Sequence, residues 1–345
     1  MKKTFIHFLF VIAAIASTGC AKTVAEGPND AKQRYFNAWI KTNHPDAKKT
    51  GRGIYVLSET AGNHTEVIED GYAIVEYRSR TLDGTITGYT DKETAKQLGT
   101  YDTTTYYGVT VWPTFAETMQ AGILDAICGM KAGGKKEVVI PSWLMSYSDF
   151  GTEEQYLAKS NSYSDAIYEI EVKEYTKNIQ AWQVSNIADY LDANQSIFQG
   201  MGPRDTIKGH SGCYYHTRST AIDTSIHFPN DTTIYINYTG KLLNGLVFDT
   251  TIEKTAKDNG LYSASRTYEP VKIHWNEDYK NITMGDDESA VIGGFALTLA
   301  QMHPMEKGIG VFTSDYGYSY SGSGSSIPPY ASLIFEIEIV AKPED

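Results

Sequence analysis

The sequence has little positive charge, few cysteines and no long apolar run beyond its N-terminus. It has 30 lysines and arginines against 42 acidic residues, a formal net charge of −12. This balance argues against nucleic-acid binding, because nucleic acids are bound mainly through lysine and arginine. No later stretch provides the roughly 20 apolar residues of a membrane-spanning helix. A well-solvated surface is sufficient reason for the acidity.

Cysteine and histidine are also scarce. If Cys20 is modified, only Cys128 and Cys213 remain, in different halves of the chain, so we expect no structural disulfide between them. His210 and His216 lie in a stretch typical of a strand and are interpreted as surface residues on one face. The histidine spacing fits no metal site, and we expect neither metal nor other cofactor.

The N-terminus has the features of an export signal. A lysine pair precedes the apolar run Phe5–Ile15, which is too short to span a bilayer. Small residues then lead to Cys20, as in a bacterial lipobox, although Ser17 stands where leucine is usual. We expect residues 1–19 to be removed and Cys20 to carry the lipid that anchors the protein in the cell envelope, in the outer membrane facing the periplasm. A plain secretory signal and exposure on the outer surface are the alternatives.

The rest of the chain divides into a polar leader and two similar halves. Residues 20–50 are interpreted as a tether followed by a short helix beginning near residue 30. Residues 51–176 and 206–345 repeat one pattern of strands, one short helix and further strands. Residues 177–205 between them predict a helical linker with a partly apolar face.

The two halves share their landmarks. Each has a hairpin turn, a short helix with one apolar face and a closing strand of alternating apolar residues. These are Asp83-Gly84, 122–130 and 168–172 in the first half, and Asn244-Gly245, 292–302 and 335–339 in the second. The pattern predicts an α+β fold of two domains, each a twisted antiparallel sheet wrapped around one short helix.

Six short motifs follow one another in the second half. They are Tyr238-Thr239-Gly240, Gly245-Leu-Val-Phe248-Asp249, Val291-Ile292-Gly-Gly-Phe295, Asp315-Tyr-Gly-Tyr318, Ile327-Pro328-Pro329 and Leu333-Ile-Phe335-Glu-Ile-Glu-Ile339. Singly each is weak, because aromatic residues on strands usually belong to the core. In this order they resemble the motifs of the FKBP family of peptidyl-prolyl cis-trans isomerases.

The resemblance implies a pocket for proline and the peptide bond before it. Its catalytic residues would be Tyr238, Phe248, Asp249, Ile292, Phe295, Tyr318 and Phe335, with Val291 and Ile327 as further substrate-binding residues. The aromatic rings would hold the proline. The Ile292 N–H and the Tyr318 hydroxyl would hold substrate carbonyls, and Asp249 would orient neighbouring groups or polarise the amide.

The chemistry fits these residue types. Rotation about an X–Pro bond is slow because the C–N bond has partial double-bond character, with a barrier of about 18–20 kcal/mol. The twisted amide is less polar than the planar one, so an apolar pocket favours it by differential binding. Such a reaction requires no nucleophile or cofactor.

The second half departs from the family in three places. Phe295 stands where the family usually has the tryptophan that floors the pocket, and Ser319 where it has glycine. The stretch between Asp249 and Val291 is about twice the usual length. Its aromatic residues, Tyr262, Tyr268, Trp275 and Tyr279, are expected either to shape the pocket entrance or to cover it.

The first half retains less of the pattern. Tyr77 and Tyr168 match Tyr238 and Phe335, and Tyr147 is aligned with Tyr318. Other site positions are changed or missing: Thr87 and Gly88 replace the Phe-Asp pair, Ile123 occupies the floor, and there is no Ile-Pro-Pro loop. We predict that residues 51–176 keep the fold without the activity.

Two hypotheses of different class follow. In the first, the protein is an isomerase that assists folding in the bacterial cell envelope, acting on X–Pro segments of unfolded or nascent exported proteins. In the second, it is a non-catalytic chaperone or binding lipoprotein that uses FKBP-like domains as scaffolds.

Overall fold

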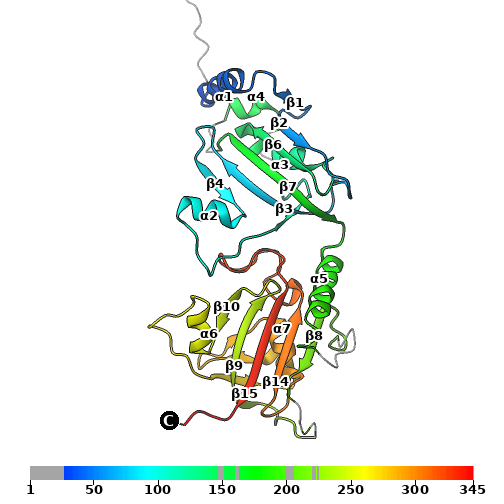
Figure 1. The fold of residues 1–345 in the computed structure, drawn as a ribbon, viewed down its shortest axis with the longest axis vertical. Coiled ribbons are helices and arrows are strands. Elements are labelled where there is room, and N and C mark those ends of the chain that lie inside the picture. The colour runs from blue at the N-terminus through cyan, green and yellow to red at the C-terminus, as the bar shows by residue number, and fades with distance from the viewer. Residues whose placement is uncertain are drawn as a thin grey trace, which may run out of the picture.

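The computed structural model describes residues 27–146, 151–159, 163–198, 206–219, 223 and 225–344. Two domains, each built on one antiparallel sheet, are joined by helix α5 (Ile179–Ala193) (Figure 1). Cys20, the expected signal segment and Tyr147 lie outside the described residues. Within the described part, no helix has both the length and the apolarity to cross a bilayer.

The N-terminal sheet has the strand order β1-β2-β6-β7-β3-β4, and β5 also pairs with β3. The strands are β1 (Lys48–Lys49), β2 (Tyr55–Thr60), β3 (Tyr72–Arg80), β4 (Ile86–Tyr89), β5 (Thr110–Pro113), β6 (Lys135–Ile140) and β7 (Ala166–Thr176). The helices of this domain are α1 (Asp30–Asn43), α2 (Lys92–Leu98), α3 (Ala121–Ile127), the 3-10 helix η1 (Ser142–Met145) and α4 (Glu153–Leu157).

The C-terminal sheet has the order β13-β12-β11-β9-β15-β14-β8, and β10 also pairs with β9. The strands are β8 (Cys213–Thr217), β9 (Thr232–Leu242), β10 (Val247–Thr250), β11 (Val271–Trp275), β12 (Thr283–Met284), β13 (Ser289–Ala290), β14 (Lys307–Phe312) and β15 (Leu333–Val340). The helices are α6 (Glu253–Asp258), η2 (Tyr279–Asn281), α7 (Gly293–Ala300) and η3 (Ser314–Tyr316).

The two sheets share one topology. The order β2-β6-β7-β3, with β4 and β5 on β3, corresponds to β8-β14-β15-β9, with β10 and β11 on β9. The register agrees as well, since Tyr77 lies opposite Ile170 and Tyr238 opposite Ile337. The predicted α+β fold of two similar domains is confirmed. The structure adds α2 and α6 after β4 and β10, and the long stretch before α7 supplies β11 and the edge hairpin β12–β13.

Each sheet packs its inner face on one short helix, as the apolar spacing predicts. In the C-terminal domain α7 buries Phe295, Leu297 and Leu299 against the sheet. The approach requires glycine: a Cβ at Gly294 would lie 2.3 Å from the Phe312 ring. The same holds for Gly122 of α3, where a Cβ would lie 2.3 Å from Ile140. These contacts align α3 with α7.

A second helix covers the outer face of each sheet. Phe36 and Ile40 of α1 pack on Val139 and Ile167 of β6 and β7. In the C-terminal domain, Ile187 of α5 packs on side chains of β8, β14 and β15, namely Tyr214, Ile309, Val311 and Ile334. The linker is therefore part of the C-terminal domain, and the repeated unit is a helix followed by a sheet domain.

The interpretation of the two histidines as surface residues on one strand face is wrong. His210 lies in the turn before β8, half-buried, with its ring 5.3 Å from that of Tyr279. His216 lies on β8, half-buried, with its ring 5.8 Å from Phe198. A residue in the turn before a strand does not follow the strand's alternation of faces, and the aromatic neighbours of both histidines come from segments distant in the sequence.

Cys128 and Cys213 are free thiols in different domains.

Candidate active site

Four aromatic rings meet at the centre of the C-terminal domain. Phe335 of β15 lies 5.0 Å from Phe295 of α7, 5.6 Å from Phe248 of β10 and 6.0 Å from Tyr238 of β9, measured between ring centroids. Tyr238 and Phe295 are 5.6 Å apart with their planes nearly perpendicular, a favourable edge-to-face arrangement. The structure thus brings together the aromatic residues proposed from the sequence, with Phe295 as a buried floor.

Four further residues of the predicted site pack on the same core. Val291, Ile292 and Tyr318 are half-buried, and Ile327 is buried. Ile292 is the N-cap of α7, so its own N–H is not used by the hydrogen bonds of that helix. A half-buried apolar rim above a buried aromatic floor is suited to hold a proline ring, while polar groups at the rim hold the chain on either side.

Asp249 is held on both of its carboxylate oxygens. The Tyr238 hydroxyl donates to Oδ2 at 2.5 Å, and Arg266 Nη1 donates to Oδ1 at 2.6 Å. The Thr250 N–H donates to Oδ1 at 2.9 Å. Burial, and then the charge of Asp249, raise the pKa of Tyr238, so its hydroxyl stays protonated and donating at neutral pH. The acid at the rim is therefore anchored in one orientation.

Arg266 is a site residue that the sequence analysis did not identify. It lies in the long stretch after α6, 17 residues beyond Asp249, and its guanidinium lies over the Tyr268 ring at 5.5 Å. The only signal in the sequence is a basic residue in a loop that starts near an acidic site residue. The residue pattern of that loop has no period from which its path could be predicted. The sequence therefore could not specify which cationic side chain reaches Asp249.

The aromatic residues of the long stretch separate into two groups. Trp275 and Tyr279 join the core of the domain. Tyr262 and Tyr268 stack on each other at 5.5 Å, and Tyr262 is exposed. The stretch therefore builds part of the domain and contributes to the site through Arg266.

The turn that carries Tyr318 is fixed by hydrogen bonds. Ser319, at the position where the family has glycine, has a left-handed φ of 53°. Its N–H donates to the Ser314 carbonyl at 2.8 Å, and its carbonyl accepts from the Tyr330 N–H at 2.9 Å. Ser323 and Ile327 exchange two backbone hydrogen bonds. Burial, and then the Asp249 charge, raise the pKa of Tyr318, which keeps this hydroxyl protonated as well.

The N-terminal domain contacts the same loop. The Tyr106 N–H donates to the Ser325 carbonyl at 2.9 Å, and the Tyr72 ring lies 5.5 Å from the Tyr330 ring, edge to face. Figure 1 shows the segment between α2 and β5 descending to the loop that precedes β15. The rim of the C-terminal site is thus bordered by both domains.

Hydrogen bonds align the corresponding residues of the first domain. The Tyr77 N–H donates to Thr90 Oγ1 at 3.0 Å, and the Tyr238 N–H donates to Thr251 Oγ1 at 2.9 Å, thirteen residues apart in both cases. Thr87 and Gly88 therefore occupy the positions of Phe248 and Asp249. Trp112, which the sequence analysis did not assign, fills the space beside Tyr77, with ring centroids 5.0 Å apart. This domain lacks the acid and its aromatic neighbour.

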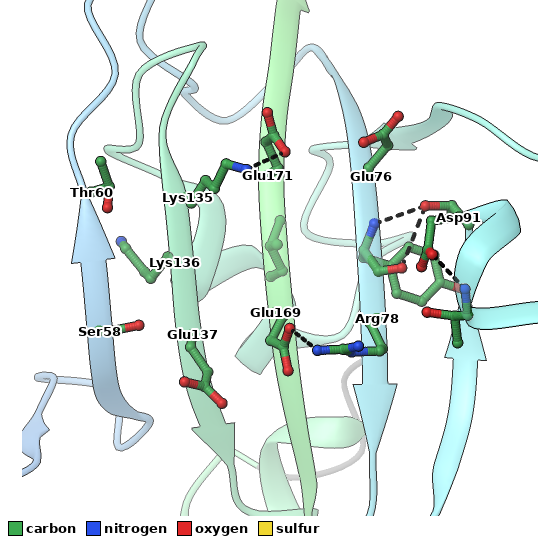
Figure 2. A pocket seen from close by; sticks show the side chains of 14 residues that line it. Ser58, Thr60, Glu76, Arg78, Asp91, Lys135, Lys136, Glu137, Glu169 and Glu171 are labelled. Atoms are coloured by element: carbon green, nitrogen blue, oxygen red, sulfur yellow. Dashed lines mark hydrogen bonds and ion pairs between the residues drawn. The ribbon is translucent and has the colours of Figure 1, made fainter. Parts of the chain in front are cut away.

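A hollow on the outer face of the N-terminal sheet, with a volume of about 470 Å³, is lined mainly by charged residues (Figure 2). Some of its charges are paired with each other, Arg78 with Glu169 at 2.5 Å and Lys135 with Glu171 at 2.9 Å. Ion pairs on a solvated face are typical of a sheet surface, so we assign no chemistry to this hollow.

Residues 225–340 match the family model described as FKBP-type peptidyl-prolyl cis-trans isomerase. This confirms the predicted resemblance for the C-terminal domain, over 116 of the 345 residues. The match includes all nine residues proposed for the site, and it also includes Arg266.

Curated relatives carry the same description. The chain is 28% identical over 137 residues to the "Probable FKBP-type peptidyl-prolyl cis-trans isomerase" of Haemophilus influenzae, covering 40% of this chain and 45% of that protein. It is 27% identical over 107 residues to the FKBP-type 22 kDa peptidyl-prolyl cis-trans isomerase of Escherichia coli, covering 31% and 39%. The chain thus spans less than half of the length of these two relatives.

Solved structures give a looser likeness. The three FKBP domains of wheat FKBP73 match 85% of this chain and 95% of that chain, with 15% identity and a TM-score of 0.28. FkpA from Escherichia coli matches 43% and 59%, with 17% identity and a TM-score of 0.30. Scores this low add no weight, and the assignment of the C-terminal domain depends on the family match and on the side chains at its centre.

Proposed function

We propose that this protein is an FKBP-type peptidyl-prolyl cis-trans isomerase whose site is the aromatic cluster around Phe335. One observation carries the proposal. In the domain that matches the family model, three aromatic rings, those of Tyr238, Phe248 and Phe295, lie around Phe335 beside a carboxylate that Tyr238 and Arg266 hold in place. This is an apolar seat for proline with polar groups along one side.

The proposed mechanism is binding of the twisted amide. The proline ring sits against the rings of Phe248, Phe295 and Phe335, away from water, where the less polar twisted state is favoured over the planar amide. The Ile292 N–H and the Tyr318 hydroxyl hold substrate carbonyls on either side. Asp249, held by Arg266, keeps the Tyr238 hydroxyl oriented and presents a fixed negative charge to the rotating amide.

The location and the natural substrates belong to the proposal as well. The predicted export signal and the small residues before Cys20 support a lipoprotein of the cell envelope, placed in the outer membrane and facing the periplasm. Its substrates would be X–Pro segments of unfolded or nascent exported proteins, and its role would be to assist their folding. Fractionation tests this: the intact protein should label with fatty acid and sediment with membranes, and Cys20→Ser should abolish both. Equal sedimentation of both forms would contradict lipid anchoring.

The activity is tested with the full chain. Wild-type protein should accelerate cis-trans exchange of an X–Pro peptide, followed by exchange NMR. Asp249→Ala and Tyr318→Phe should each lower kcat/KM about tenfold, since hydrogen bonds to charged or substrate groups contribute ~1.5–3 kcal/mol. A fragment that begins near residue 201 is unsuitable, because it lacks α5 and exposes the sheet face that α5 covers. A folded full chain without catalysis would reject the isomerase proposal.

One observation favours the second candidate, a binding role independent of catalysis. A groove of about 540 Å³ lies between the domains, and most of its lining is apolar. Side chains from both domains and from α5 contribute, including Val111, Trp182, Leu243 and Pro329. If this groove binds unfolded chains, the Asp249→Ala protein should still suppress aggregation of an unfolded reporter, and Trp182→Ser should weaken that suppression. If Asp249→Ala abolished the suppression of aggregation together with catalysis, the suppression would depend on the isomerase site and the separate binding role would be rejected.

A further inference from the structure

The turn that carries Tyr318 is held by a residue of the linker helix. Gln183 of α5 is 1% exposed, and its side-chain amide faces Ser314, the first residue of η3. Gln183 Oε1 accepts from the Ser314 N–H at 2.7 Å, and Nε2 donates to Ser314 Oγ at 2.9 Å. Both ends of one buried amide are therefore used on one residue of the turn.

Ser314 in turn fixes the backbone on both sides of Tyr318. Its carbonyl accepts from the Gly317 N–H at 2.9 Å and from the Ser319 N–H at 2.8 Å. These two bonds enclose Tyr318, so a displacement of Ser314 must displace the Tyr318 hydroxyl. A path of hydrogen bonds thus runs from Gln183 through Ser314 to the residues that flank Tyr318.

Packing alone does not require an amide at this position. The face of α5 that covers the sheet is otherwise apolar, with Ile187 buried and Tyr190 and Leu191 packed beside it. A buried polar group is unfavourable unless its hydrogen bonds are made, whereas an apolar side chain of similar size would satisfy the packing. The specific contribution of Gln183 is therefore its pair of directed bonds to Ser314.

In the first domain, the corresponding turn is held by residues of that same domain. Ser142 begins η1 as Ser314 begins η3, and its N–H donates to Asp165 Oδ1 at 2.7 Å. Its hydroxyl shares a 2.7 Å hydrogen bond with that of Tyr156. Both partners lie within that domain, after η1. In the C-terminal domain the partner comes from outside residues 225–340, the part that matches the family model.

We propose that Gln183 is a positioning residue of the isomerase site, acting through Ser314 on Tyr318. The functional unit then begins at α5, upstream of β8. The inference rests on the proposed function only in that Tyr318 contacts substrate; the hold of Gln183 on the turn does not depend on it.

The experiment uses the full chain and three variants. Gln183→Met keeps the size of the side chain and removes both hydrogen bonds. Gln183→Glu keeps an acceptor for the Ser314 N–H and is the conservative rescue. Ile187→Val, on the same face of α5 in the cluster with β8, β14 and β15, is the control for simple loosening of the helix. Each variant is also made with Tyr318→Phe, and kcat/KM is measured together with hydrogen exchange of the Ser314 and Ser319 amides.

Gln183→Met should lower kcat/KM about tenfold, since small misplacements of a substrate-binding group have effects of that order. Gln183→Glu should recover most of the activity, and Ile187→Val should keep it. In the Tyr318→Phe background the effect of Gln183→Met should largely vanish, because both changes act on one group. Gln183→Met should also speed exchange of the two amides, whether or not the chain is an isomerase.

Two results would overturn the positioning role. One is an unchanged exchange rate at Ser314 and Ser319 in Gln183→Met. The other is a loss of activity that equals that of Ile187→Val or adds fully to that of Tyr318→Phe. If wild-type protein shows no catalysis while the amide exchange responds as expected, the proposed function fails and the hold of Gln183 on the turn stands.

Discussion

The two domains share a frame and differ at the site, and the comparison separates what the fold needs from what the chemistry needs. Both keep a tyrosine on the central strand, the threonine that caps its N–H and the glycine that lets the inner helix approach the sheet. Only the C-terminal domain has Asp249, Phe248 and a phenylalanine floor. The retained residues meet backbone and packing requirements that both domains share, whereas Phe248, Asp249 and Phe295 are specific to the C-terminal domain.

The segment that follows α2 in the first domain and α6 in the second supports the same distinction. In the first domain Tyr101 stacks on Tyr107 at 5.6 Å, and in the second Tyr262 stacks on Tyr268 at 5.5 Å. In both, a backbone N–H donates to the hydroxyl of the later tyrosine. Arg266, however, corresponds to a threonine of the first domain. The acid and its cation are thus absent together, which indicates that Arg266 serves the site and the stacked tyrosines serve the loop.

The largest expected effect is on the central ring. Phe335→Ala should lower the free energy of unfolding of the C-terminal domain by about 3–5 kcal/mol, as is usual for a buried phenylalanine. Tyr168 occupies the matching position and is only half-buried, so Tyr168→Ala should lower the free energy of unfolding of its domain by less. Denaturation followed by hydrogen exchange in each domain measures both. Equal losses would mean that the two cores depend on this position alike.

The next effect tests the ion pair. Arg266→Met should lower kcat/KM by up to about fivefold, because both partners of the pair are partly exposed and such ion pairs contribute ~0.2–1 kcal/mol. The control is Lys257→Met, since that lysine lies over Tyr262 as Lys96 lies near Tyr101 and belongs to the shared frame. It should leave kcat/KM unchanged. A similar loss in both variants would assign Arg266 to the loop instead of the site.

A smaller effect is expected at Ser319. Its left-handed φ of 53° is unfavourable for a residue with a Cβ, by about 1–2 kcal/mol, so Ser319→Gly should raise the free energy of unfolding by up to about 1 kcal/mol after the entropy of the unfolded glycine is counted. Thermal unfolding measures the change. Ser321→Gly, at an exposed neighbour without a positive φ, should be neutral or destabilising. Stabilisation by both would point to the loop as a whole.

The smallest expected effect concerns the first domain, which should gain no isomerase activity when site residues are copied into it. Thr87→Phe, Gly88→Asp and Thr105→Arg together copy the acid, its aromatic neighbour and its cation into the first domain. A Cβ at Gly88 would lie 2.9 Å from Ser79 Oγ and 3.2 Å from the Tyr77 ring, so the new carboxylate would be displaced. Placed in an Asp249→Ala chain, the triple change should restore no isomerase activity. Recovered activity would show that three residues suffice to separate the domains.

Periodic features of the sequence predicted most of the frame. The alternation in Phe335–Ile339 and the hairpin turn at Asn244-Gly245 placed strands correctly, because burial on one face and turn geometry are local properties. The motif order located the aromatic residues around Phe335. These predictions concern neighbours in sequence or positions shared with a family.

The rest depends on contacts between distant residues. Arg266 reaches Asp249 through a non-periodic loop, and Gln183 meets Ser314 across 131 residues. Trp112 replaces missing rings from a different strand. The expectation of one helix per sheet was incomplete for the same reason: α1 and α5 were recognised as helices, but nothing in their spacing states which sheet they cover.

The covering helices set the order in which the chain can fold. Synthesis begins at the N-terminus, so α1 and α5 emerge before the strands on which they pack, β6 and β7 for α1 and β14 and β15 for α5. Contacts of such long sequence separation form late, because the loop between them must close first. The apolar face of each helix therefore stays exposed until the last strand that it covers, β7 for α1 and β15 for α5, has been synthesised and has paired. Completion of that strand is the event that buries both sides of the sheet together.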